Sequence, residues 1–340
     1  MAIAKLFTPL TLRGQTNPLR LAPGIPPAIT ATYYDQRATP GGLLVSEVTN
    51  ISPMARGYFG APGIFNDEQT EGWSHVTKTV RTKGGKIFLQ LWYTGRCNHP
   101  LNQPQGELPV SSSATSLDGV KSAAVAREGK QAYVTPRALE TDEIVSIIEG
   151  YRKAAVNALD AGFDGTELHA GNGYLLEQFL CDSVSERSDE YGDSVENRVG
   201  PSRVTLRLSP FGTTFGCTDS DPERLYGHAV KKLNTYDLAY LHLIEPRGVL
   251  VPADGVTALL RLLYDGTVIS ASGYDRASVI EAVERGTTDA VAFGRALIAN
   301  PDLLARLQQG ADLNHPKVKS YYLGGEEGYT DYPFFPSKRS

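Results

Sequence analysis

The stretch Phe163-Asp164-Gly165-Thr166-Glu167-Leu168-His169-Ala170-Gly171-Asn172-Gly173-Tyr174 carries the strongest evidence for both the fold and a site. Its first six residues form a short apolar run typical of a buried strand, and they follow an amphipathic helical pattern at residues 141–161. His169 and Asn172 leave that strand three residues apart, so both can donate to one electronegative atom, and Tyr174 adds a phenol that can give up a proton. Two donors beside an acid are what reduction of a conjugated carbonyl requires.

Strand and helix patterns alternate along the whole chain, which predicts an α/β protein. Several predicted strands are nearly continuous apolar runs, as expected for parallel strands buried on both faces. The predicted strands are residues 19–22, 43–48, 86–92, 163–169, 204–208, 238–244, 267–270 and 290–293. The predicted helices are residues 28–37, 67–82, 141–161, 221–234, 275–285 and 300–309, with Asp275 and Asn300 as N-caps.

This alternation indicates a (β/α)8 TIM barrel that forms a single domain over residues 1–340. A doubly wound sheet is the alternative. The barrel is favoured because polar, Gly-rich and aromatic residues follow strand ends throughout the chain and not at one switch point. Residues 98–137 are rich in Ser, Pro and Gly, and we expect them to form a lid-like excursion over one mouth of the barrel, with a small hairpin.

The composition is that of an ordinary globular protein, with 340 residues of which 41% are hydrophobic and 21% charged. A net charge of −5 and the lack of a basic block argue against nucleic acid or an anionic membrane as a partner. No apolar run approaches the roughly 20 residues of a membrane helix. Cys97, Cys181 and Cys217 are far apart and form no CxxC motif, so we expect a cytoplasmic protein and no metal site.

Two polar side chains interrupt predicted strands. Gln90 lies inside an apolar strand, and a buried amide there either faces a ligand or finds its partners in the core. Arg207 also lies inside a predicted strand, where a cation needs an anionic or electron-rich partner. That partner is either a ligand or a carboxylate such as Glu47 or Glu167.

The last two predicted strands end in Ser272-Gly273-Tyr274 and Phe293-Gly294-Arg295. Phosphate sites recur in TIM barrels after the seventh and eighth strands, where backbone N–H groups and a helix N-terminus meet. Glycine permits close approach of the backbone, and Arg295 supplies a guanidinium for the phosphate. The sequence therefore predicts a phosphate site at these two loops.

Together these residues resemble the Old Yellow Enzyme family of FMN-dependent NAD(P)H ene reductases, which includes 12-oxophytodienoate reductases. The similarity spans nearly the whole chain and consists of segments that follow one another in the family's order. These segments are residues 6–10, 33–38, 85–92, 169–179, 189–192, 207–212, 292–295, 299–303 and 327–333.

The resemblance implies that FMN lies across the carboxyl ends of the strands and is reduced by NADPH or NADH. Gln90 would bind the pyrimidine edge of the flavin, and Arg207 would stabilise the reduced ring near N1 and O2. The whole implied set of cofactor-binding residues is Pro23, Gln90, Arg207, Gly273, Gly294 and Arg295.

The same resemblance implies a small-molecule substrate with a conjugated carbonyl group. His169 and Asn172 would bind its carbonyl oxygen, Tyr174 would protonate its α-carbon, and Tyr322 would line its pocket. Because the family includes monomers and dimers, we expect a monomer or a homodimer.

The chain departs from the family at apparent internal deletions. After Pro23 it lacks the segment that normally flanks flavin N5 and O4. After Arg198 only four residues precede Arg203, so the outer helix between the fourth and fifth strands is predicted to be missing, leaving apolar barrel wall uncovered. Val48 replaces a small residue near the flavin. These departures leave two alternatives: a non-reducing isomerase or cyclase that uses the His/Asn/Tyr set, and an inactive barrel homologue.

Overall fold

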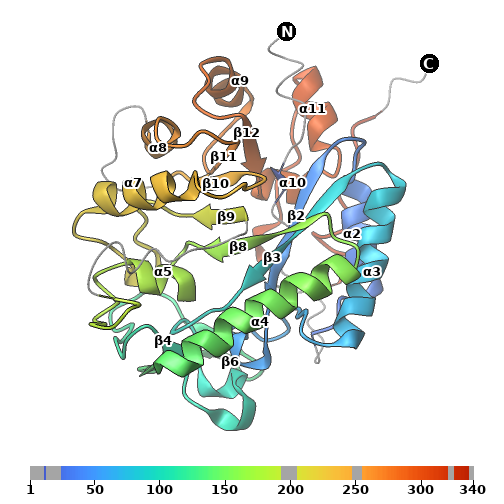
Figure 1. The fold of residues 1–340 in the computed structure, drawn as a ribbon. Helices are drawn as coiled ribbons and strands as arrows, with labels where there is room; N and C mark the ends of the chain where they lie inside the picture. The colour runs from blue at the N-terminus through green and yellow to red at the C-terminus, as the bar shows by residue number, and fades with distance from the viewer. Residues whose placement is uncertain (1–10, 13–23, 193–204, 247–254, 321–324, 337–340) are drawn as a thin grey trace.

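The computed structural model describes residues 11–12, 24–192, 205–246, 255–320 and 325–336. Its central element is a parallel sheet with the strand order β1-β12-β11-β10-β9-β8-β3-β2. The strands are β1 (Thr11–Leu12), β2 (Leu43–Asn50), β3 (Lys86–Trp92), β8 (Gly165–Ala170), β9 (Thr205–Leu208), β10 (Leu241–Ile244), β11 (Val268–Ala271) and β12 (Ala290–Phe293). β1 and β2, at the two ends of this order, contact each other, so the sheet curls into a barrel (Figure 1).

Helices surround the strands (Figure 1). They are α2 (Ala28–Arg37), α3 (Asp67–Thr82), α4 (Thr141–Asp160), α5 (Leu175–Leu180), α7 (Pro222–Leu233), α8 (Val256–Arg261), α9 (Arg276–Glu284), α10 (Arg295–Ala299) and α11 (Leu303–Gln309). Within the described ranges, none of these helices has the length and apolar character needed to span a membrane.

The predicted barrel is confirmed, and the strands from β2 to β12 in the barrel begin and end within three residues of the predicted positions. The strand predicted at residues 19–22 lies outside the described residues. β1, which pairs with β12, was not predicted, because two residues carry no periodic pattern.

One predicted helix cap is wrong. Asn300 ends α10 instead of starting the next helix: its amide nitrogen donates to the Ala296 carbonyl at 2.7 Å, and its amide oxygen accepts from the Asn314 backbone at 2.7 Å. The Asn300 side chain, which the local sequence pattern assigned to a helix N-cap, is therefore occupied by its contact with Asn314. Asp275 does cap α9 as predicted, accepting from the Ser278 backbone at 2.9 Å.

The segment between β3 and α4 contains four short strands. β4 (Val110–Ser111) pairs with β7 (Arg137–Ala138), and β5 (Ala124–Ala126) forms an antiparallel hairpin with β6 (Gly129–Gln131). A hairpin thus lies within residues 98–137. The division into one domain and the lid role of this segment stay predictions.

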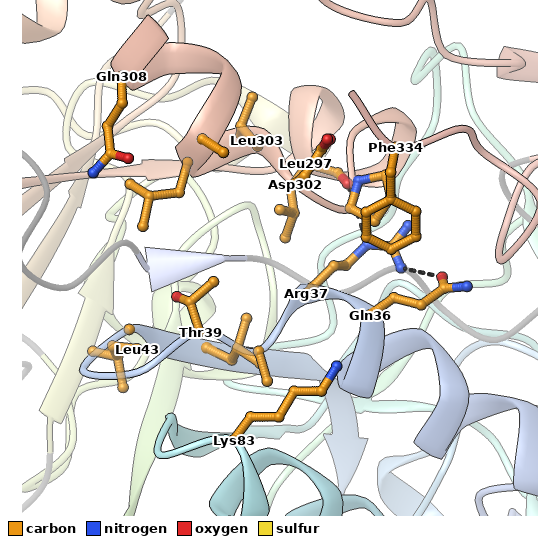
Figure 2. A pocket seen from close by; sticks show the side chains of 16 residues that line it. Gln36, Arg37, Thr39, Leu43, Lys83, Leu297, Asp302, Leu303, Gln308 and Phe334 are labelled. Carbon is orange, nitrogen blue, oxygen red and sulfur yellow. Dashed lines mark hydrogen bonds between the residues drawn. The ribbon is translucent and has the colours of Figure 1, made fainter. Parts of the chain in front are cut away.

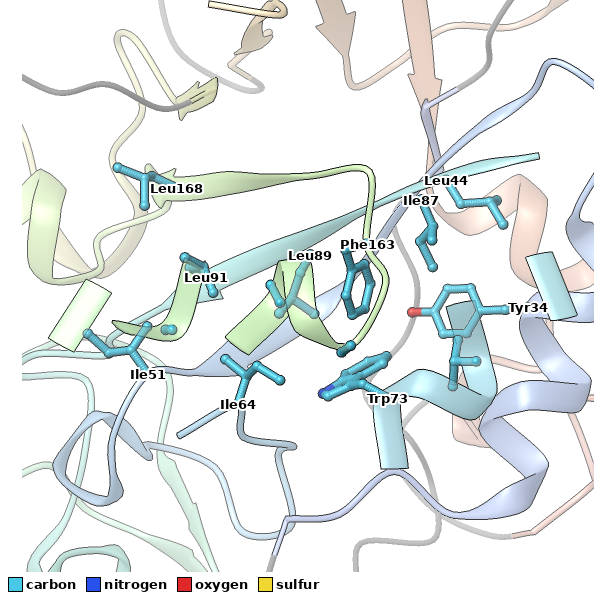
Figure 3. Close-up of a cluster of buried hydrophobic side chains, with 14 of the residues drawn as sticks. Tyr34, Leu44, Ile51, Ile64, Trp73, Ile87, Leu89, Leu91, Phe163 and Leu168 are labelled. Carbon is cyan, nitrogen blue, oxygen red and sulfur yellow. The ribbon is translucent and has the colours of Figure 1, made fainter. Parts of the chain in front are cut away.

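The hydrophobic core beside β3 fixes the strands that carry the site. Trp73 of α3 packs edge-on against Phe163, with ring centroids 5.4 Å apart, and its indole N–H donates to the Gly63 carbonyl at 3.1 Å. Ile87, Leu89 and Leu91 alternate along β3, are all fully buried, and belong to the same core cluster as Trp73 and Phe163 (Figure 3). Alternation sends Gln90 to the opposite face of β3, which is the barrel interior.

The outer layer of the barrel exposes apolar side chains on α4, the helix that precedes β8. The predicted missing helix falls at residues 193–204, outside the described residues, and α5 is the helix that the described residues place between β8 and β9. α4, which leads into β8, exposes between 45% and 59% of Val145, Ile148, Val156 and Leu159. Exposed apolar surface of this kind favours association.

Arg37 joins the first described helix to the last part of the barrel. Its guanidinium is 2% exposed and donates to the backbone carbonyls of Leu297, Ile298 and Tyr329 at 3.2, 2.8 and 3.1 Å. It also lies 3.6 Å from the centre of the Tyr33 ring. Three distant carbonyls therefore depend on one cation.

A cavity of about 370 Å³ lies beside Arg37 (Figure 2). Leu43, at the amino end of β2, and Leu303 of α11 line it. The cavity is thus at the opposite end of the barrel from His169, which lies near the carboxyl end of β8. It is not part of the site that the sequence predicts.

We predict that Arg37→Met lowers the free energy of unfolding by about 3–5 kcal/mol, because three buried carbonyls lose their donor. Denaturant titration measures this. The control is Lys83→Met, which removes a cation of the same cavity from an exposed ion pair with Asp35 and is expected to cost under about 1 kcal/mol. An Arg37→Met loss as small as that of the control would contradict this role.

Candidate active site

The carboxyl ends of β3, β8 and β9 bring three predicted site residues together. Gln90 pairs in register with Glu167, and His169 pairs with Arg207. All four are at most 4% exposed. Neighbouring parallel strands end at the same mouth of a barrel, so these polar side chains share one buried end of it.

A left-handed turn carries Asn172 and Tyr174 away from β8. Asn172 and Gly173 have φ values of 58° and 76°. A Cβ on Gly173 would lie 2.4 Å from the Thr214 carbonyl oxygen, so this position also needs glycine for space. The Tyr174 ring ends edge-on to His169, with centroids 5.1 Å apart. The turn therefore places the predicted acid against one of the two predicted donors.

An aromatic wall surrounds Tyr174. The Trp92 ring meets it edge-on at 5.0 Å, Tyr58 stacks on Trp92 at 5.6 Å, and Phe215 lies 5.7 Å from Tyr174. The Trp92 indole N–H is buried without a hydrogen-bond partner among the residues that the structure describes. Flat apolar surface with a few polar groups is typical of a small-molecule site.

The Tyr174 phenol lies close to two further phenols. Tyr58 is near both Tyr174 and Tyr133, and Tyr133 belongs to the segment 98–137. Burial raises the pKa of Tyr58 well above its usual value, and the nearby Tyr174 and Tyr133 phenols raise it further. The segment 98–137 therefore reaches the neighbourhood of the site.

Glu167 connects the interior side chains below this wall. Its Oε1 accepts from Gln90 Nε2 at 2.5 Å, and its Oε2 lies 2.9 Å from His242 Nδ1. Burial alone would raise the pKa of Glu167, but His242, Arg207 and the Gln90 amide together lower it to about 2. Glu167 is therefore a buried carboxylate that stays ionised, and Arg207 is one of the charges that keep it so.

Several of these residues were not predicted from the sequence. Trp92 follows Gln90 by two residues in one strand and so shares its face, a signal that could have identified it. Tyr58 and Phe215 come from loops without a pattern. His242 could not be assigned, because its contact with Glu167 depends on which strands lie side by side.

The interior residues fit the pyrimidine end of a flavin. Gln90 Oε1 is buried and has no hydrogen-bond partner within the described part of the chain, so it can accept from the ring N–H of a ligand. The Arg207 side chain supplies a buried positive charge beside it. An acceptor and a cation at one strand end match an imide edge that gains negative charge on reduction.

The predicted phosphate residues also lie together. β11 and β12 pair in register up to Ala271 and Ala292, so the loops that follow them are neighbours. Gly273 has φ 92°, which glycine adopts without strain, and the Arg295 side chain is exposed. Pro23 and Tyr322 lie outside the described residues, and their roles stay predictions.

We predict that Glu167→Gln lowers the free energy of unfolding by about 3 kcal/mol at pH 7, because the buried Arg207 loses its counter-charge and His242 loses the carboxylate that it contacts. The folded-state pKa of Glu167 lies below the unfolded value, so this stabilisation is present above about pH 4.5 and is lost as pH falls toward 2. The deficit of the variant should therefore shrink in acid.

Denaturant titration at pH 7 and pH 3 tests this expectation. Glu149→Gln is the control, because Glu149 is an exposed carboxylate paired with Arg152, and its stability should change little at either pH. A Glu167→Gln deficit of equal size at both pH values would contradict an ionised carboxylate.

Known proteins with similar sequences are flavin-dependent oxidoreductases, in agreement with the interior residues that fit a flavin. The model of the NADH:flavin oxidoreductase / NADH oxidase family matches residues 16–314. 12-Oxophytodienoate reductase 1 of Oryza sativa subsp. japonica is 43% identical over 331 residues, which cover 91% of this chain and 85% of that protein.

Two solved structures share the fold. A structure of morphinone reductase in complex with tetrahydroNAD has a TM-score of 0.91 and 42% identity, covering 97% of this chain and 94% of that one. The old yellow enzyme homologue from Zymomonas mobilis has a TM-score of 0.88 and 36% identity, covering 96% and 95%. The resemblance found in the sequence is thus confirmed, and the chain belongs to the NADH:flavin oxidoreductase / NADH oxidase family.

Proposed function

We propose that this protein is an FMN-dependent oxidoreductase that reduces the C=C bond of an α,β-unsaturated carbonyl compound with NADPH or NADH. The observation that carries the proposal is the contact of His169 with Tyr174, 5.1 Å between ring centroids, at the end of β8, which pairs with the strands that hold Gln90 and Arg207. A hydrogen-bond donor for a carbonyl oxygen, an acid, and interior side chains suited to a flavin ring thus lie at one end of the barrel.

Bound FMN supplies hydride transfer between the nicotinamide and the substrate. Gln90 would hold the pyrimidine edge through its buried Oε1, and Arg207 would offset negative charge near N1 and O2. Gly273, Gly294 and Arg295 would hold the phosphate. Pro23 is proposed to contact the flavin on the strength of the family resemblance alone.

The substrate half of the site consists of donors and one acid. His169 and Asn172 would donate to the carbonyl oxygen, which draws electron density from the β-carbon. The Tyr174 hydroxyl would give its proton to the α-carbon. Trp92 supplies a flat wall beside that phenol, and Tyr322 is proposed to line the same pocket.

The partners are proposed to be a small conjugated carbonyl compound and no nucleic acid or membrane, with the protein a monomer or homodimer. A cytoplasmic location is proposed because Cys97, Cys181 and Cys217 are all buried free thiols. The isomerase or cyclase alternative and the inactive barrel gain no support, because the relatives named above are reductases.

We predict that the purified protein, supplied with FMN, shows a flavin spectrum that NADPH bleaches and 2-cyclohexenone restores. Stopped-flow absorbance follows both half-reactions separately. A protein that cannot be loaded with FMN would refute the proposal, and so would turnover of the enone without consumption of NADPH.

Tyr174→Phe should slow restoration of the spectrum by 2-cyclohexenone about 10²-fold or more, because the α-carbon loses its proton donor. Bleaching by NADPH should be unaffected. Tyr236→Phe changes a phenol just after the end of α7, outside the proposed site; it is the control and should match the wild type in both steps. An unchanged rate with Tyr174→Phe would exclude Tyr174 as the acid.

A further inference from the structure

Glu177, which the proposed mechanism does not use, binds the backbone of the turn that carries Asn172 and Tyr174. Glu177 lies in α5 and is 3% exposed. Its Oε2 accepts from the Gly173 backbone at 2.5 Å, and its Oε1 accepts from Ser209 Oγ at 2.5 Å. Tyr226 of α7 donates to the same Oε1 at 2.9 Å. One carboxyl group thus joins the turn, the end of β9 and α7.

The hold on the turn extends to its neighbouring peptide groups. Ser209 Oγ, which donates to Glu177, accepts in turn from the Asn172 backbone N–H at 2.7 Å. Gln178, the next residue of α5, donates to the Gly173 carbonyl at 2.8 Å. The N–H and C=O of Gly173 are therefore fixed by adjacent side chains of α5, and the Asn172 N–H is fixed by Ser209, which itself donates to Glu177.

This restraint is needed because of the backbone conformation. Asn172 has φ 58°, a left-handed value that costs a non-glycine residue free energy, although asparagine tolerates it better than most. Asn172 and Tyr174 flank Gly173, whose N–H is the group that Glu177 binds directly. Loss of that contact frees the residue between the proposed carbonyl donor and the proposed acid.

We infer that Glu177 is a positioning residue for the carbonyl-binding turn, and that its ionised carboxylate holds Asn172 and Tyr174 where they meet the substrate. The inference rests on the proposed function for the meaning of the turn, but not for its geometry. Glu177 touches neither the substrate nor the flavin region and acts through the backbone of the turn.

The ionised form of Glu177 binds the turn better than the protonated form does, although burial opposes ionisation. Gly173, Ser209 and Tyr226 present three donors, and a carboxylate accepts from all of them, whereas a protonated carboxyl must donate at one oxygen. Burial raises the pKa of Glu177 to about 7, while these three hydrogen bonds act in the opposite direction. The other titratable groups that face it are the thiols of Cys97 and Cys181.

The sign of the pH effect follows. Glu177 is half ionised at about pH 7, so the turn is held at pH values above this and released as the carboxylate takes up a proton below it. Because the folded-state pKa is raised, ionisation of Glu177 costs stability as pH rises from about 4.5 to 7. Glu177→Gln should therefore raise Tm at pH 8 while it impairs the turn, a combination that a purely structural role would not produce.

The first test uses the FMN-loaded protein, NADPH and 2-cyclohexenone. For Glu177→Gln we expect normal bleaching by NADPH and at least tenfold slower restoration by the enone at pH 8. The wild type should lose about tenfold in the restoration step between pH 8 and pH 6, and Glu177→Gln should not. A wild-type profile without a step near pH 7, or Glu177→Gln with wild-type restoration, overturns the inference.

The second test needs no flavin. Hydrogen exchange of the backbone at residues 171–174 should be faster in Glu177→Ala than in the wild type, and unchanged in Glu190→Gln, which alters an exposed carboxylate. Equal exchange in all three proteins overturns the inference. A wild type that fails to bleach with NADPH, yet shows faster exchange in Glu177→Ala, refutes the proposed function and leaves the restraint itself intact. If the variants do not fold, the wild-type pH profile decides.

Discussion

The ion-pair and hydrogen-bond cluster around Glu167 is the constraint on which the interior of the barrel depends. Its carboxylate accepts a hydrogen bond from Gln90 Nε2 at 2.5 Å and lies 2.9 Å from His242 Nδ1. The charge of Arg207 helps to keep it ionised. A buried cation such as Arg207 is costly without an opposite charge. Glu167 therefore permits a positive charge where the flavin ring is proposed to become negative, and it orients the amide that would bind the ring.

β8 links this interior cluster to the substrate half of the site. Glu167 and His169 are two residues apart in β8, so both point into the barrel. The chain then turns at Asn172 and enters α5, where Glu177 fixes the turn. Two buried carboxylates therefore act in different ways: Glu167 stays ionised beside Arg207, while burial raises the pKa of Glu177 to about 7, so that it changes charge near neutral pH.

The sequence revealed the parts of this arrangement that follow a local pattern. Strand periodicity located the barrel strands, and polar residues at their ends identified Gln90 and His169. The contact of His242 with Glu167 depends on strand order, which no local pattern contains. Glu177 looks like any polar residue in a helix, and its role emerges only when Ser209 and Tyr226 pack against it. The roles of His242 and Glu177 therefore follow from tertiary contacts, which a local sequence pattern does not contain.

The central claim is that the strand ends form a site built for FMN, with a ring end in the interior and a phosphate end after β11 and β12. Titration of the flavin-free protein with FMN and with riboflavin, followed by flavin fluorescence, tests it most directly. The account predicts saturable binding of one FMN per chain, tighter than that of riboflavin, which lacks the phosphate. No binding of FMN, or equal affinity for the two flavins, would contradict it.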